Sequence, residues 1–501
     1  MNNANQHDDN YLRIYSAATE HLHSGNISEA RGLVNKLLSF RANDFDSLNL
    51  LGAIEATDGK YLLATEYFFK AIQKKLQPEV ILDVYRNIIR CYELSSEFEK
   101  AIPIYKLILE LKPNSIEFWY GFAQSLTVVG NKAQAMEAYA KVIKYTSIYK
   151  EPAKRSFSFY ALSQSGCFCE ENIKFIHQEL SLCSSYDVKA KLYFSLGNYY
   201  DNDKQYDLAF KYLEQANICK SKIVRYDAEQ ALDKAVELVN IFSKSNIEKY
   251  GALISDSTIL QTSPIFIVGL PRSGSTLIEA LLSNAKNTCT IGESRYFSQV
   301  ILESERLEMP EKRYPGNVFD LSQNQCQLLG QKYFDFTQSS FSKRIVDKFL
   351  ANFWNIGFIK MLFPKAKIVC CRKNPVDACF SLYKQDFYEG HPYAYSLENC
   401  AHYYELFEKL MTHWDSLFPE QIYHIQYENF VGNPKKHSQE LFSYCNIDWQ
   451  DQFLDNFSNS KNIRTASSFQ IRDGINQNSI YQSMQYKDHL AQLYNRFSTE
   501  Y

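Results

Sequence analysis

The chain has 501 residues, of which 45% are hydrophobic, and a formal net charge of −3 at pH 7. This length allows two or three domains that each bury a core, and the near-neutral charge argues against a general nucleic-acid or membrane-surface binder. The polar start at residues 1–10 predicts a disordered segment and contains no secretory leader. Since no apolar run reaches the length of a membrane span, we expect a cytoplasmic protein that contacts neither nucleic acid nor membrane.

The 12 cysteines do not form the paired C-x-x-C clusters of a zinc site. The closest spacings are those of Cys167 with Cys169 and of Cys370 with Cys371. Without a secretory leader, cysteines are expected to stay reduced, and in a core they behave as small apolar residues. The sequence therefore predicts no metal site.

A repeating pattern of about 34 residues runs through the first half of the chain. Its clearest copy covers residues 45–78, where Gly52 and Ala64 allow two helices to approach closely and Phe68 fills the space between successive units. Similar copies begin near residues 11, 82 and 116, and a fifth covers Tyr193–Ala216 after a less regular helical region. Several copies in register predict a helical solenoid.

The pattern resembles the tetratricopeptide repeat, and we predict that the array covers residues 11–250. Its last helix, residues 227–250, leads into a polar segment, so we place the linker at residues 251–263. Repeat arrays expose a concave groove, which would bind a polypeptide substrate or a partner protein. A second copy of the chain, in a homodimer, is a further candidate partner.

Strand-like and helical stretches alternate over residues 264–501, which predicts an α/β domain with a mainly parallel sheet. The first segment, Pro264–Ile278, reads PIFIVGLPRSGSTLI and predicts a strand, a glycine-containing loop and a helix. At such a junction the loop amides and the first N–H groups of the helix converge on an anion. The lysine of the nucleoside-triphosphate loop is missing and Arg272 lies inside the loop, so a nucleotide kinase is disfavoured.

A second candidate anion site follows the strand predicted at residues 367–371. Arg372 stands at the carboxyl end of this strand, and Ser381 follows nine residues later on a helix. Because ligands bind beyond the carboxyl ends of parallel strands, both residues belong to the edge that carries the first loop. A guanidinium and a hydroxyl there suit a second phosphate. The alternative is an arginine that caps a strand and a serine that faces solvent.

Several motifs of the second half resemble those of sulfotransferases, which use 3′-phosphoadenosine 5′-phosphosulfate (PAPS) as donor. These motifs are GLPRSGST, IGESRYF, VDKFLANF, FPKAKIVCCRKNPVDACFSLY, YENFVGNP and RTASSFQIR. Together with the repeats, they resemble bacterial proteins that join tetratricopeptide repeats to a sulfotransferase domain and, more distantly, the tyrosylprotein sulfotransferases. The resemblance implies an α-solenoid followed by an α/β, P-loop-like sulfotransferase domain at residues 264–501. It also implies PAPS as co-substrate and no metal.

The resemblance further implies which residues bind the donor. The 5′-phosphosulfate would contact the loop, and the 3′-phosphate would contact the second anion site. The implied donor-binding residues are Arg272, Ser273, Gly274, Ser275, Thr276, Arg372 and Ser381, with Ser467 as a further one.

The implied catalytic residues are Glu293 as base, Lys348 near the leaving phosphosulfate, and Arg272. These roles agree with sulfuryl transfer, which needs removal of the acceptor proton and cations at the departing oxygen. The alternative for Glu293 is a surface ion pair with Arg295, and the alternative for Lys348 is a solvated helix end.

The chain departs from the resemblance at Leu350, where relatives commonly have proline, and in the tail Tyr481–Ser483, where they favour glycine, a basic residue and tryptophan. The missing base at Gln482 removes one cation from the donor pocket, for which Lys487 could compensate. We predict transfer of a sulfuryl group from PAPS to an acceptor hydroxyl, foremost a protein tyrosine, with a glutamate base. Two alternatives stay open: a repeat scaffold with a weak or inactive sulfotransferase domain, and a sulfotransferase for a carbohydrate or small molecule.

Overall fold

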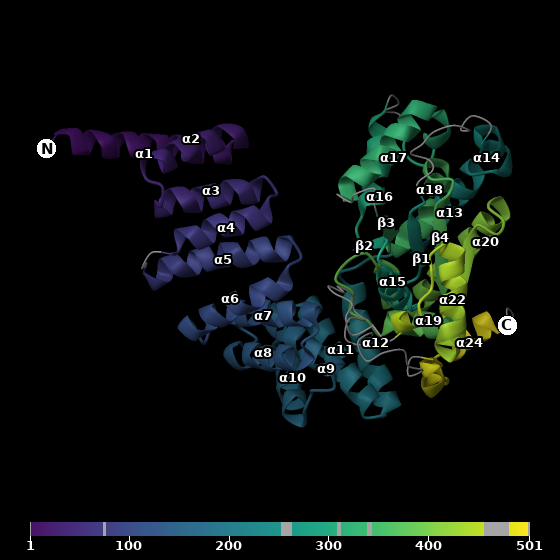
Figure 1. Cartoon of the computed structure of the whole chain (residues 1–501). Coiled ribbons are helices and arrows are strands. Elements are labelled where there is room, and N and C mark those ends of the chain that lie inside the picture. Colours follow the sequence, from purple (N-terminus) through teal and green to yellow (C-terminus); the bar gives the residue numbers. More distant parts are fainter. Residues whose placement is uncertain are drawn as a thin grey trace. The chain divides into compact units, whose positions relative to one another are not determined.

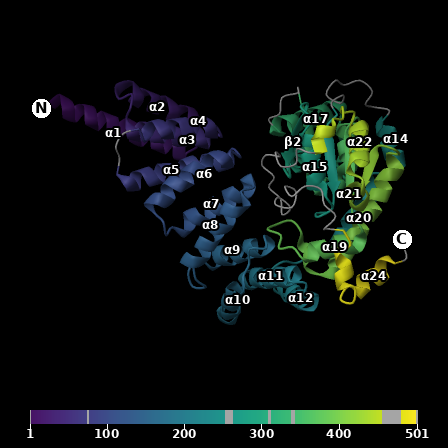
Figure 2. The same ribbon diagram turned by 60° about the horizontal axis from the view of Figure 1, so that its bottom comes forward.

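The computed structural model describes residues 2–73, 77–251, 263–307, 312–337, 343–454 and 480–498. The chain forms two compact units, Met1–Ser158 and Phe159–Tyr501. Figure 1 shows the helices and strands of both units, and Figure 2 shows them after a rotation.

The first unit is a stack of helices in which each helix packs on the next (Figure 2). The helices are α1 (Asn2–His23), α2 (Ile27–Phe40), α3 (Phe45–Thr57), α4 (Tyr61–Ala71), α5 (Pro78–Leu94), α6 (Phe98–Leu111), α7 (Ile116–Val129) and α8 (Lys132–Tyr145). Gly52 on α3 lies against the ring of Phe68 on α4, where a Cβ atom would be 2.6 Å from Phe68 Cε1. The predicted helical repeat array is confirmed over this part of the chain.

The first residues of the chain differ from the prediction. Residues 2–10, which their polar composition predicts to be disordered, form the first turns of α1. Extending an existing helix adds one hydrogen bond for each residue that is fixed, whereas starting a new helix is costly. The apolar face that begins after residue 10 provides the start, and the polar residues before it continue the same helix.

The fifth predicted repeat belongs to the second unit, where it forms the helix pair α11 (Tyr186–Asn202) and α12 (Tyr206–Ser221). The helices before and after this pair in the chain are α9 (Pro152–Gln164), α10 (Glu170–Leu182), α13 (Ala228–Ile241) and α14 (Lys244–Gly251). The helix predicted at residues 227–250 is interrupted at Phe242, whose fully buried ring lies against Gly357 and Trp414. The domain division predicted at residues 251–263 falls mostly outside the described residues and stays a prediction.

The second unit contains a five-stranded parallel sheet in the order β2-β3-β1-β4-β5. Its strands are β1 (Ile265–Gly269), β2 (Thr288–Gly292), β3 (Arg344–Asp347), β4 (Lys367–Arg372) and β5 (Ile422–Gln426). The central strand β1 is buried along its whole length, as expected for a parallel sheet that is covered on both faces. The predicted α/β domain with a parallel sheet is confirmed.

Helices pack on both faces of this sheet (Figure 1). One face carries α15 (Ser275–Ser283), α21 (Tyr427–Gly432) and α22 (Pro434–Cys445), and the other carries α16 (Tyr296–Arg306), α17 (Gln323–Thr337), α18 (Ile356–Leu362), α19 (Pro375–Tyr383) and α20 (Leu397–Leu417). Short 3₁₀ turns and one further helix complete the unit: η2 (Val318–Asp320), η3 (Leu350–Asn355), η4 (Pro392–Tyr395), η5 (Asp451–Leu454), η7 (Gln482–Tyr486) and α24 (Ala491–Phe497).

Most of the 12 cysteines are buried, and Cys167 and Cys169 are exposed. Within the described ranges, no group of three or more His, Cys, Asp and Glu side chains is arranged to hold a metal ion. Among the helices that the structure describes, none is both long and apolar enough to cross a membrane.

Candidate donor-binding and catalytic site

The loop between β1 and α15 turns so tightly that two of its positions accept only glycine. Gly269 has φ 145°, and a Cβ atom there would lie 2.5 Å from the carbonyl oxygen of Cys371 on β4. Gly274 has φ 84°, and its Cβ atom would lie 2.4 Å from Cδ2 of Tyr427. Helix α15 starts at the next residue, Ser275, so its first N–H groups point back toward the loop. This geometry suits a bound anion.

The polar side chains of the loop are mostly buried, as for Ser273, Ser275 and Thr276. Ser273 Oγ donates a hydrogen bond to the carbonyl oxygen of Leu270 at 2.6 Å, which closes the turn. Arg272 has φ 71°, in the left-handed region, and is half-buried. Burial lowers the pKa of Arg272, while the neighbouring phenols of Tyr160 and Tyr427 act in the opposite direction. A guanidinium stays charged under such shifts, so the loop holds a partly desolvated cation.

Lys348 lies beside two carboxylates at the carboxyl edge of the sheet. Its side chain is 0% exposed, and its Nζ lies 2.6 Å from Glu293 Oε1 and 3.4 Å from Glu279 Oε2. The backbone N–H of Lys348 donates to the carbonyl oxygen of Gly292 at 3.1 Å, which joins the segments after β2 and β3. Thr290 Oγ1 donates to the second oxygen of Glu279. Lys348 is therefore a buried cation, and the alternative of a solvated helix end is excluded.

Glu293 is the accessible member of this group. Its side chain is 49% exposed, whereas that of Glu279 is 11% exposed. The alternative ion pair of Glu293 with Arg295 is not formed, because Arg295 lies 3.6 Å from Glu389 instead. Glu293 thus presents one carboxylate both to Lys348 and to solvent.

The second anion site differs from the prediction by one residue. Lys373, directly after β4, donates from Nζ to Ser381 Oγ on α19 at 3.2 Å. Its residue is 4% exposed, and its Nζ lies 5.4 Å from the ring centre of Tyr427, the residue that also touches Gly274. Burial is the main cause that lowers the pKa of Lys373 to about 8, and the positive charge of Arg272 acts in the same direction. Lys373 therefore lies beside the first loop.

Arg372 turns to the other side of the strand. Its Nε donates to His424 Nδ1 at 2.9 Å, and its Nη1 donates to Glu408 Oε2 at 2.6 Å. Burial lowers the pKa of Arg372, but the negative charge of Glu408 contributes to a net rise. The structure thus brings Ser381 to Lys373 and pairs Arg372 elsewhere, because successive residues of a strand point to opposite faces.

The tail Tyr481–Ser483 is tied to the start of α19. The backbone N–H groups of Tyr481 and Ser483 donate to the carboxylate of Asp377 at 2.6 and 2.8 Å. This places the exposed Gln482, where relatives have a base, near the helix that carries Ser381. Lys487 is also exposed. The predicted donor residue Ser467 lies outside the described residues.

The carboxyl edge of the sheet therefore collects the loop, Lys348 with Glu293, and Lys373 with Ser381. Glu279 and Lys373 are not among the site residues predicted from the sequence. The sequence contained a signal for Lys373. Arg372 and Lys373 stand next to each other at the end of β4, and strand alternation places only one of them on the side of the loop. Glu279 carried no comparable signal, because a glutamate on a helix is usually solvated.

The parallel sheet and the glycine-bounded loop at its carboxyl edge define a P-loop-like α/β domain, whose loop geometry suits an anion. Residues 264–451 match the model of the Sulfotransferase family. The second half of the chain thus carries a sulfotransferase-family domain, which follows helical repeats.

Three individual similarities were found in addition. An uncharacterized protein of Aquifex aeolicus (strain VF5) is 28% identical over 313 residues, which are 61% of this chain and 41% of the relative, so the chain spans less than half of that protein. The solved sulfotransferase domain from the curacin biosynthetic pathway is 13% identical, with a TM-score of 0.31, over 46% of this chain and 97% of that one. YrrB, a tetratricopeptide-repeat protein with an unusual peptide-binding site, is 16% identical, with a TM-score of 0.26, over 40% of this chain and 89% of that one.

Proposed function

We propose that the protein transfers a sulfuryl group from PAPS to an acceptor hydroxyl. The observation that carries this proposal is the buried Lys348, held 2.6 Å from the half-exposed Glu293 at the sheet edge where the loop ends. A base that is open to solvent and a cation that is shielded from it are the two groups that sulfuryl transfer requires. The match of residues 264–451 to the Sulfotransferase family supports the same reaction class.

For the donor, we propose that residues 272–276 hold the 5′-phosphosulfate and that Lys373 with Ser381 holds the 3′-phosphate. Lys373 takes the place that the sequence argument gave to Arg372, because Arg372 already donates to Glu408 and His424. The contact between Lys373 and Ser381 supports this assignment. PAPS is the donor that fits two separate anion sites on one edge of a sheet.

In the proposed reaction the acceptor oxygen attacks the sulfur of PAPS, and the bond from sulfur to the 5′-phosphate oxygen breaks. The phosphate oxygen leaves with the bonding electrons, and the product is 3′,5′-adenosine bisphosphate (PAP). Glu293 takes the acceptor proton, while Lys348 and Arg272 stabilise the negative charge that develops on the leaving oxygen.

For the acceptor, we propose a tyrosine in a polypeptide that the repeats bind or align. The resemblance to tyrosylprotein sulfotransferases supports a phenolic hydroxyl, and the repeat array supports a polypeptide partner. The exposure of Glu293 leaves room for a bulky acceptor. A carbohydrate or small-molecule acceptor is the competing outcome of the test below.

The first experiment is a calorimetric titration of the full chain with PAP, followed by transfer of labelled sulfate from PAPS to tyrosine peptides and to sugars. We expect saturable PAP binding, and we expect label on the peptides. Glu293→Gln should retain PAP binding and lose turnover by about 100- to 10,000-fold, as removal of a general base does. A folded wild-type protein that binds no PAP would instead favour the scaffold function, for which the missing base at Gln482 is the motivating feature.

A further inference from the structure

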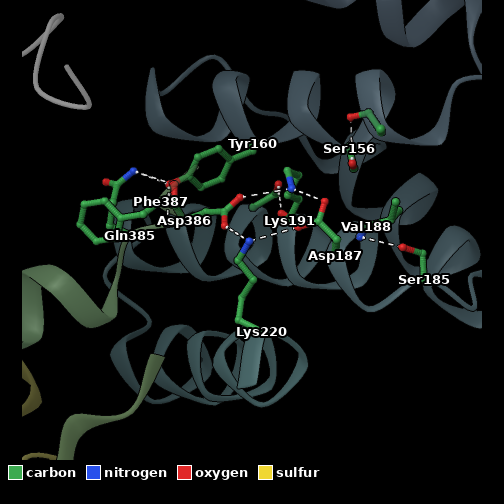
Figure 3. Close-up of polar contacts among 12 residues, drawn as sticks. Ser156, Tyr160, Ser185, Asp187, Val188, Lys191, Lys220, Gln385, Asp386 and Phe387 are labelled. Carbon is green, nitrogen blue, oxygen red and sulfur yellow. Dashed lines mark hydrogen bonds and ion pairs between the residues drawn. The ribbon is translucent and has the colours of Figure 1, made fainter. Parts of the chain in front are cut away.

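A cluster of ion pairs, in which Asp187 is 44% exposed and the other three members are mostly buried, joins the fifth repeat to the loop that follows α19, residues 384–391 (Figure 3). Asp386 in this α19–η4 loop has a side chain that is 6% exposed, and its Oδ1 lies 2.7 Å from Lys220 Nζ on α12. Its Oδ2 lies 3.6 Å from Lys191 Nζ on α11. Asp187 on α11 lies 2.6 Å from Lys191 and 3.1 Å from Lys220. Two lysines and two aspartates therefore compensate each other.

A tyrosine from α9 holds the backbone of the same loop. The hydroxyl oxygen of Tyr160 accepts a hydrogen bond from the backbone N–H of Asp386 at 3.0 Å and another from Gln385 Nε2 at 2.8 Å (Figure 3). Tyr160 is 4% exposed, and burial raises its pKa while the positive charge of Arg272 acts in the opposite direction. The start of the α19–η4 loop is thus fixed by repeat helices close to the donor loop.

The far end of the α19–η4 loop borders the proposed base. Glu389 lies 3.6 Å from Arg295, two residues after Glu293. Burial lowers the pKa of His391 to about 4, and the negative charge of Glu293 acts in the opposite direction. Tyr388, directly before Glu389, is 97% exposed. The loop therefore runs from the repeat helices to the rim around Glu293.

The energetics of the cluster point to a positional role. Removing two charges from water costs about as much as their attraction returns, so an apolar pair of the same size would stabilise the fold equally well. An ion pair additionally fixes the geometry between the two elements that carry its charged residues. Here those elements are a repeat helix and the loop beside the base.

We propose that Asp386, with Lys220 and Lys191, is a positioning residue that sets the α19–η4 loop for acceptor binding. The fifth repeat is then a structural part of the acceptor site. This inference rests on the proposed sulfotransferase function for its effect on the KM of the acceptor, but its effect on the loop can be measured without activity.

The test compares Lys220→Met, Asp386→Asn and the double variant in the full chain. Each single variant leaves one buried charge uncompensated, so its fold is at risk. The double variant removes both charges and should melt close to the wild type while the loop loses its anchor. Glu55→Gln is the matched control, because Glu55 is also a buried carboxylate, 4% exposed and 2.7 Å from Arg31, but belongs to the first unit.

Hydrogen exchange of residues 385–391 and PAP titration are the readouts that need no acceptor. We expect faster exchange in the double variant, no change in the control, and PAP affinity within about twofold of the wild type. With the tyrosine peptide that the wild type sulfates, KM should rise by about tenfold while kcat stays within about threefold.

Two results would overturn the inference. Unchanged exchange of residues 385–391 in the double variant would show that the cluster does not hold the loop. Faster exchange with an unchanged KM would show that the loop does not serve the acceptor. If the wild type neither binds PAP nor transfers sulfate, the proposed function fails and the acceptor role falls with it, whereas the exchange result still reports on the anchor.

Discussion

Replacing Lys373 by alanine is expected to weaken PAP binding far more than replacing its neighbour Arg372. A hydrogen bond to a charged group contributes about 1.5–3 kcal/mol, and each 1.4 kcal/mol corresponds to about tenfold in affinity. Since Lys373 is 4% exposed, solvent screens little of this contribution. We therefore expect Lys373→Ala to raise the Kd of PAP by about 10- to 100-fold, and Arg372→Ala to leave it within about twofold.

The pH dependence of PAP binding tests the role of Lys373 in a second way. Burial lowers the pKa of Lys373 to about 8, so its ammonium form falls from about nine-tenths at pH 7 to about one-tenth at pH 9. The phosphate groups of PAP are at least about nine-tenths ionised over this interval, because their second pKa is near 6. Wild-type affinity should thus drop by about tenfold between pH 7 and pH 9, and Lys373→Arg should bind PAP with little dependence on pH.

Protein stability provides the control for this experiment. The folded pKa of Lys373 lies below its ordinary value of 10.5, so at pH 7 the unfolded chain holds this proton more tightly and the buried charge destabilises the fold. Its removal in Lys373→Met should stabilise the ligand-free protein at pH 7 by up to about 3 kcal/mol. Calorimetry at pH 7 and 9, with thermal melting of each variant, tests both effects. Lost PAP binding in Arg372→Ala with full binding in Lys373→Ala would refute the reasoning.

Three further predictions concern the sheet edge. Lys348→Met leaves the carboxylates of Glu279 and Glu293 without their shared cation, so we expect a lower Tm and turnover reduced by about 100- to 1,000-fold in the sulfate-transfer assay; near-wild-type turnover would contradict this. Burial raises the pKa of Asp347 to about 7, so its contribution to stability is complete below the unfolded value near 4 and is lost as pH rises through 7, by about 1.4 kcal/mol between pH 6 and 8. Thermal melts of Asp347→Asn should lack this decline. An identical decline in the variant would show that Asp347 is not its cause. In Gly274→Ala the alanine would have to keep φ 84°, and its Cβ atom would lie 2.4 Å from a ring carbon of Tyr427. The substitution should lower the free energy of unfolding by about 1–3 kcal/mol and abolish PAP binding in titration. Retained binding would show that the loop tolerates a side chain.

The sequence by itself determined the local parts of this protein. The 34-residue pattern predicted the helical repeats, and the alternation of strands and helices predicted the parallel α/β domain. The loop between β1 and α15 was predicted as well, because a strand followed by glycines and an apolar helix can adopt few other conformations. In each case the information lies within one short stretch, where covalent geometry and side-chain periodicity dictate the structure.

Only the tertiary structure decided which side chains meet. It turned Arg372 toward Glu408 and brought Lys373 to Ser381, because the pleat of β4 separates neighbouring residues to opposite faces. It also joined Asp386 to Lys220, which are 166 residues apart in the chain. Such contacts follow from how whole helices pack on the sheet, and packing depends on the shapes of all neighbours at once. The same holds for α12, which packs on η4 and η7, two segments that the repeat pattern does not contain.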